Sequence, residues 1–94
     1  MNNSQKPVFH VLTFDSTSFA IQSEKKIKED FKIAVMPTPR ELTASCGLAI
    51  KFLENGFDEI IGYVKELDVP CKLYAMTEEK MDGKRGVQLL FSND

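Results

Sequence analysis

The stretch V-F-H-V-L-T-F-D-S-T, residues 8–17, decides the fold class because it joins a strand to the start of a helix. Its first seven residues are mostly β-branched or aromatic, which is typical of a short buried strand. Asp15-Ser16-Thr17 follows, a cluster of residues that cap helix N-termini. Apolar residues then recur at helical spacing, and we expect a strand over 8–14 and a helix over 16–31. The expected buried stripe of this helix consists of Ala20, Ser23, Ile27 and Phe31, widened by Phe19 and Ile21.

The remaining chain shows the same alternation of strand and helix patterns. A strand pattern ends at Pro37, because proline donates no ladder hydrogen bond. In the next strand pattern Leu48, Ile50 and Phe52 point one way and Ala49 points the other. Further elements are a helix capped by Asn55 and a hairpin turning at Asp82-Gly83. The expected strands after the first helix are Lys32–Met36, Cys46–Leu53, Val69–Met76 and Val87–Phe91, and the second helix buries Phe57, Ile60, Ile61, Val64 and Leu67.

The order of these elements predicts an α+β fold. Strand–helix–strand–strand–helix–strand, with two helices on one face of a mainly antiparallel sheet, is the ferredoxin-like βαββαβ two-layer sandwich. The 94 residues are expected to form a single domain. Its core spans about residues 8–76, and residues 77–94 form a C-terminal hairpin or extension that adds a further strand.

Composition excludes several function classes. The net charge is −2, from 12 basic and 14 acidic residues, which gives no pull toward nucleic acid or an anionic membrane. No apolar run approaches the ~20 residues that a membrane helix needs. The first seven residues are polar and lack the apolar centre of a signal peptide. We therefore expect a cytoplasmic protein that binds neither nucleic acid nor membrane.

The cysteines and the single histidine limit the chemistry further. Cys46 and Cys71 are 25 positions apart and form no C-x-x-C pair, so neither a metal site nor a cofactor is expected. A disulfide does not suit a reducing compartment. We interpret Cys71 as structural, and His10, inside the first strand, as a hydrogen-bonded structural residue. A Cys46–His10 nucleophile–base pair would require that strand to end beside Cys46.

The most unusual segment is P-T-P-R-E-L-T-A-S-C-G, residues 37–47, which joins two expected strands. Its prolines stiffen the connection and lower the entropy cost of holding one shape. Arg40 supplies a permanent positive charge. Successive backbone N–H groups around Cys46 can face an anion, which would favour a thiolate. The candidate site consists of Cys46 as the reactive thiol, with Arg40, Thr43, Ser45 and Gly47 stabilising its charge.

The run P-T-P-R-E-L-T-A-S-C-G-L-A-I, residues 37–50, resembles the signature of a family of small bacterial proteins, the selenium/sulfur (Se/S) carrier-like proteins. Residues 13–17 and 24–29 are also similar, and the resemblance covers about residues 8–76. It implies a cysteine that carries sulfur or selenium as a persulfide or selenopersulfide, and the matching residue is Cys46. The implied partners are a donor, such as a cysteine desulfurase or selenocysteine lyase, and an acceptor protein. Such a carrier is not an enzyme, and its thiol is expected to face outward.

Two alternatives stay open. The first is a ferredoxin-like regulatory or small-ligand module whose loop binds an anion through Arg40, with Cys46 serving only as packing. The second, a thiol-dependent enzyme, has no base, metal site or phosphate-binding motif to support it. In either case the Val87–Phe91 strand would lie at a sheet edge, where pairing with a second copy would give a homodimer.

Overall fold

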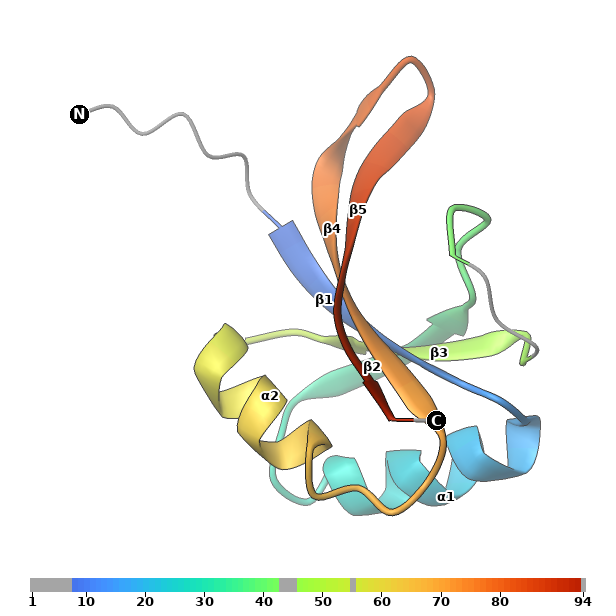
Figure 1. The fold of residues 1–94 in the computed structure, drawn as a ribbon, viewed down its shortest axis with the longest axis vertical. Helices are drawn as coiled ribbons and strands as arrows, with labels where there is room; N and C mark the ends of the chain where they lie inside the picture. Colours follow the sequence, from blue (N-terminus) through green and yellow to red (C-terminus); the bar gives the residue numbers. More distant parts are fainter. Residues whose placement is uncertain (1–7, 43–45, 55, 94) are drawn as a thin grey trace.

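The computed structural model describes residues 8–42, 46–54 and 56–93 (Figure 1). Within these ranges five strands form one antiparallel sheet and two helices pack against it, which confirms the α+β class and the additional C-terminal strand. None of the helices described is long and apolar enough to cross a membrane. The elements are β1 (Val8–Phe14), α1 (Thr17–Ile27), β2 (Ile33–Pro37), β3 (Leu48–Phe52), α2 (Phe57–Val64), β4 (Cys71–Met81) and β5 (Lys84–Asn93).

The strand order in the sheet is β2-β3-β1-β4-β5, so β1 lies at the centre. Leu12 is opposite Ile50 of β3 on one side and Leu73 of β4 on the other. The tip of the β4–β5 hairpin extends well beyond the rest of the sheet (Figure 1). At this tip Asp82 and Gly83 both have positive φ, of 57° and 82°. That is the backbone shape of a two-residue hairpin turn, and it confirms the predicted turn.

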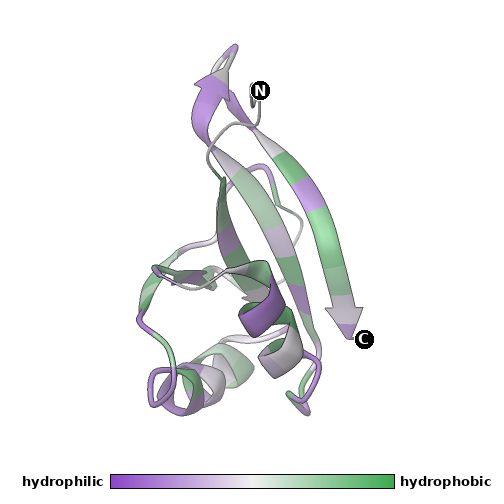
Figure 2. Cartoon of the chain, turned by 90° about the vertical axis from the view of Figure 1, so that its left-hand side faces the viewer, coloured by the Kyte–Doolittle hydropathy of each residue, from purple (hydrophilic) through white to green (hydrophobic). Residues whose placement is uncertain are grey.

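Alternation along the strands divides the buried side chains between the two faces of the sheet. Leu12 and Phe14 of β1 face the helices, whereas Phe9 and Val11 face the other side. Both helices lie on the same side of the sheet (Figure 2). The helix-facing cluster consists of Leu12, Phe14, Ala20, Ile27, Cys46, Ile50, Phe52, Ile60, Val64, Leu67, Cys71 and Leu73. The opposite cluster consists of Phe9, Val11, Leu42, Ala49, Tyr74 and Met76.

Capping residues and first-turn charges explain where the two helices begin. The Ser16 side chain accepts a hydrogen bond from the Phe19 N–H at 3.3 Å, which caps α1 within the predicted cluster. Gly56 is the N-cap of α2, and the expected cap, Asn55, lies outside the described residues. Asp58 and Glu59 sit in the first turn of α2, where negative charge interacts favourably with the helix dipole.

Several predicted boundaries are wrong. Helix α1 ends at Ile27, because residues 28–30 turn the chain toward β2, and Phe31 lies beyond the helix. Ile21 is 48% exposed, so the buried stripe is narrower than expected. The last two strands are longer than predicted. Their polar residues near the tip gain backbone hydrogen bonds by pairing across the hairpin, as between Lys80 and Arg85.

The finer prediction, a ferredoxin-like sandwich, is not confirmed for the sheet as a whole. Strand β5 is ten residues long and pairs with β4 from Cys71 to Met81. The observed sheet therefore has five strands, and β5 forms one of its edges.

Two isoleucines of α1 provide a matched test of this packing. Ile27 is fully buried and Ile21 is about half exposed. We expect Ile27→Ala to lower the free energy of unfolding by about 2–5 kcal/mol, because it leaves a cavity between α1 and the sheet. Ile21→Ala should change it by less than about 1 kcal/mol. Urea unfolding followed by circular dichroism measures both, and equal losses would contradict this placement of α1.

Candidate functional site

The connection between β2 and β3 is held by Thr38. Its N–H donates to the Gly47 carbonyl at 2.9 Å, and its Oγ1 donates to the Cys46 carbonyl at 2.9 Å. The first bond continues the β2–β3 ladder beyond the Pro37–Leu48 pair, and the second joins the Thr38 side chain to the residue before Gly47. They fix the backbone of Cys46 at the base of β3.

The sulfur of Cys46 lies between this connection and the start of α1. The Leu48 N–H donates to Cys46 Sγ at 3.3 Å. Thr17 Oγ1 lies 3.6 Å from the same sulfur, within hydrogen-bond distance. Thr17 is the first residue of α1, where the helix dipole is positive. An N–H donor and a helix N-terminus are both groups that stabilise an anionic sulfur.

The expectation of an outward-facing thiol is wrong. Cys46 is only 3% exposed and packs in the helix-facing cluster. The cause is the position of its backbone, which Thr38 holds so that the side chain points under α1 rather than to solvent. Gly47, the next residue, is exposed, so the thiol lies close beneath the surface of the connection.

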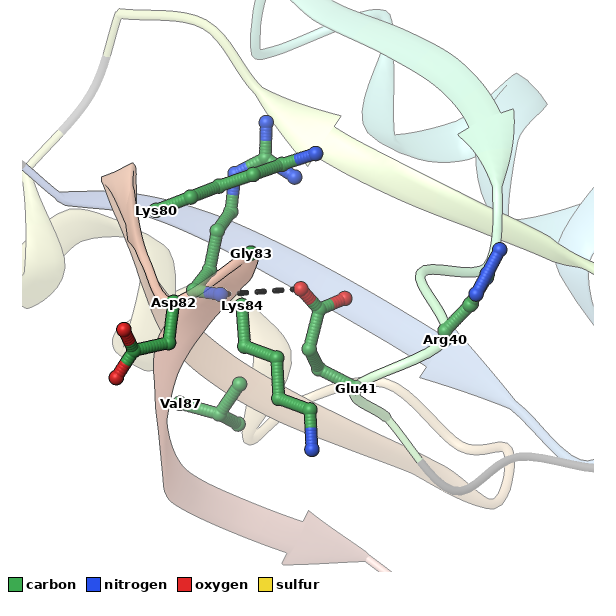
Figure 3. A pocket seen from close by; sticks show the side chains of 8 residues that line it. Arg40, Glu41, Lys80, Asp82, Gly83, Lys84 and Val87 are labelled. Carbon is green, nitrogen blue, oxygen red and sulfur yellow. Dashed lines mark hydrogen bonds between the residues drawn. The ribbon is translucent and has the colours of Figure 1, made fainter.

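Of the residues predicted to stabilise the thiolate, the structure describes Gly47 and Arg40. Gly47 is next to Cys46, whereas Arg40 is exposed and lines a cleft with the tip of the β4–β5 hairpin (Figure 3). Thr43 and Ser45 lie outside the described residues.

Thr17 and Thr38 contact Cys46, but the sequence singled out neither as a site residue. Thr17 belongs to the predicted capping cluster, and Thr38 lies between Pro37 and Pro39. The contacts of Thr17 and Thr38 with Cys46 depend on antiparallel pairing between segments that are distant in sequence. The sequence could indicate only that the two polar loops can lie at the same edge of the sheet.

His10 and Cys71 do not complete a catalytic pair with Cys46. His10 is opposite Phe52, at the far end of β3 from Cys46, and its ring centroid lies 6.3 Å from that of Phe57. Partial burial lowers the pKa of His10. Cys71 is 1% exposed opposite Phe14, and neither cysteine forms a disulfide in the described chain. The described residues contain no group of three or more His, Cys, Asp or Glu side chains placed to hold a metal ion.

The lowered pKa of His10 gives the stability of the fold a pH dependence. As the pH falls from about 7.5 to 5.5, the unfolded chain takes up the proton before the folded chain does, so the free energy of unfolding should decrease. His10→Gln should flatten this part of the profile. Urea unfolding across the pH range measures the slope, and an unchanged slope in the variant would show that His10 is not its source.

Thr38→Val tests what keeps Cys46 covered. The variant keeps the shape of the side chain but removes its bond to the Cys46 carbonyl, which should cost about 1 kcal/mol of stability. We expect iodoacetamide to label Cys46 slowly in the wild type and several times faster in the variant, because the connection opens more often. Labelling of each cysteine is read by peptide mass spectrometry.

Thr77→Val is the matched control, since Thr77 Oγ1 donates to the Glu79 carbonyl within the hairpin and accepts from the Gly86 N–H. It should leave the labelling rate of Cys46 unchanged. Equal acceleration by both variants would show that labelling reports global unfolding instead.

A family of known proteins matches most of the chain. Residues 9–74 match the family described as "Putative Se/S carrier protein-like". No curated protein and no solved structure matches the chain. The match spans most of the chain and includes β1 to the middle of β4, together with Cys46 and its contacts. The chain therefore belongs to the Se/S carrier protein-like family.

Proposed function

We propose that this protein carries one sulfur or selenium atom on Cys46, as a persulfide or selenopersulfide. The observation that supports it is the setting of Cys46 Sγ, which accepts the Leu48 N–H and lies beside Thr17 at the start of α1. An N–H donor and a helix N-terminus are groups that interact favourably with an anionic persulfide. The family match supplies the class of cargo.

The transfer needs no base, metal or external oxidant. The Cys46 thiolate attacks the outer sulfur of a persulfide on a donor protein. The S–S bond of the donor breaks, a new S–S bond forms on Cys46, and the donor cysteine leaves as a thiolate. Delivery to an acceptor thiol is the same exchange in reverse, so electrons and atoms balance at each step. A cysteine desulfurase or a selenocysteine lyase is a suitable donor.

Burial of Cys46 fits a carrier only if the connection opens. Because Cys46 is only 3% exposed, the cysteine of a second protein cannot reach its sulfur in this conformation. Between transfers, the same cover would protect a bound persulfide from water and stray thiols. Opening on contact with a donor or acceptor is therefore part of the proposed mechanism.

The burial of Cys46 also favours a second candidate, a binding module in which this cysteine only packs. In that case the cleft beside Arg40 would be the functional site. The two candidates differ in a single measurable property, the ability of Cys46 to gain a chalcogen atom.

We also propose that the fold has a ferredoxin-like core and that the protein works in the cytoplasm. The order β2-β3-β1-β4 with both helices on one face supports a ferredoxin-like core to which β5 is an addition. Two cysteines outside any disulfide suit the reducing conditions of the cytoplasm.

Mass spectrometry of the intact protein tests the cargo. After incubation with a cysteine desulfurase and cysteine, the wild type should gain the mass of one sulfur atom, and reduction with dithiothreitol should remove it. Incubation with a selenocysteine lyase and selenocysteine shows whether selenium is accepted as well. Cys46→Ala should abolish the gain.

Cys71→Ala is the matched control, because Cys71 is also buried but belongs to β4. It should keep the gain of mass. No gain in the wild type, or an equal gain in Cys46→Ala, would refute the carrier and leave the binding module.

A further inference from the structure

A cleft of about 720 Å³ lies between the Arg40–Glu41 turn and the tip of the β4–β5 hairpin (Figure 3). Its hairpin residues lie outside the family match, which ends at residue 74. The lining is almost entirely charged and consists of Arg40, Glu41, Lys80, Asp82, Gly83, Lys84, Arg85 and Val87.

Positive charge dominates the cleft of a protein whose net charge is −2. Four of the lining side chains are cations and two are carboxylates. Within the described residues, no ion pair joins Arg40, Lys80 or Lys84 to a carboxylate. The cations come from two segments that meet only in the folded chain, so the charge surrounds an open space rather than following one element (Figure 3).

Two features of the hairpin are unfavourable in the absence of an anion. Lys80 is directly opposite Arg85 across the strands. Like charges in that position destabilise a sheet. The Nε of Arg85 is buried and has no hydrogen-bond partner among the described residues, which also carries a cost. An anion in the cleft would reduce the first of these two costs, the repulsion between Lys80 and Arg85.

One of the two carboxylates in the lining, Glu41, shows which charge state the surroundings favour. Glu41 Oε2 accepts the backbone N–H of Arg85 at 3.1 Å. This bond, with the nearby charges of Arg85 and Lys80, lowers the pKa of Glu41. The surroundings therefore stabilise an ionised carboxylate.

We propose that this cleft binds an acidic segment of a partner protein, through carboxylates that contact Lys80, Lys84, Arg85 and Arg40. A protein segment fits better than a small molecule, because small-molecule pockets are mostly apolar and Val87 is the one large apolar side chain in this lining. The acidic balance of the whole chain opposes nucleic acid. The proposal does not depend on the chemistry of Cys46.

Fluorescence anisotropy with labelled hexaglutamate at low ionic strength tests the cleft. We expect the wild type to bind hexaglutamate, to ignore hexaglutamine, and to lose affinity as salt is added. The double variant Lys80→Gln/Arg85→Gln should bind roughly five- to tenfold more weakly, because it removes two charges that face the ligand. Lys80→Gln alone should give part of this loss, and circular dichroism confirms that each variant is folded.

Lys25→Gln/Lys26→Gln is the matched control, because it removes the same charge from the exposed surface of α1. It should leave the affinity unchanged. Absence of hexaglutamate binding, equal weakening by both double variants, or tighter binding of oligouridylate or pyrophosphate than of hexaglutamate would overturn the proposal. Sulfur loading of Cys46, measured on the same variants, should be unaffected, so failure here is distinguishable from failure of the carrier.

Discussion

The antiparallel pairing of β1 with β3 is the constraint on which the site depends. Thr13 lies opposite Ala49, so the chain that leaves β1 and the chain that enters β3 meet at the same end of the sheet. Helix α1 starts at that end with Thr17, and Cys46 arrives there just before β3 begins. A slip of one residue would turn Leu12 to the opposite face and would also separate the sulfur from the helix start.

Local patterns predicted most of the fold and only part of the site. The bounds of β1, the Ser16 cap and the alternation of Leu48, Ala49 and Ile50 follow from neighbouring residues, and all are confirmed. The burial of Cys46 could not be predicted, because it depends on packing against a helix 29 positions earlier in the chain. The position of Arg40 in a cleft could not be predicted either, because it depends on how its turn lies relative to the β4–β5 hairpin. Near the tip this hairpin is polar, so its sequence shows no apolar pattern that would indicate the arrangement.

The C-terminal hairpin extends the sheet, but it also contacts the rest of the chain at both ends. At one end the Asn93 side chain donates to the carbonyls of Leu67 and Val69, which fastens β5 to the segment that follows α2. At the other end the Arg85 N–H holds Glu41 in the β2–β3 connection. The same connection carries Cys46.

Under the proposed function, exchange between proteins requires this connection to open, because Cys46 is buried. The contacts that hold the described part of the connection include the two Thr38 bonds, the Leu42 N–H bond to the Pro39 carbonyl, the Glu41 bond and the packing of Leu42. Each hydrogen bond contributes only about 0.5–1.5 kcal/mol net, so local opening costs less than unfolding a domain of typical stability.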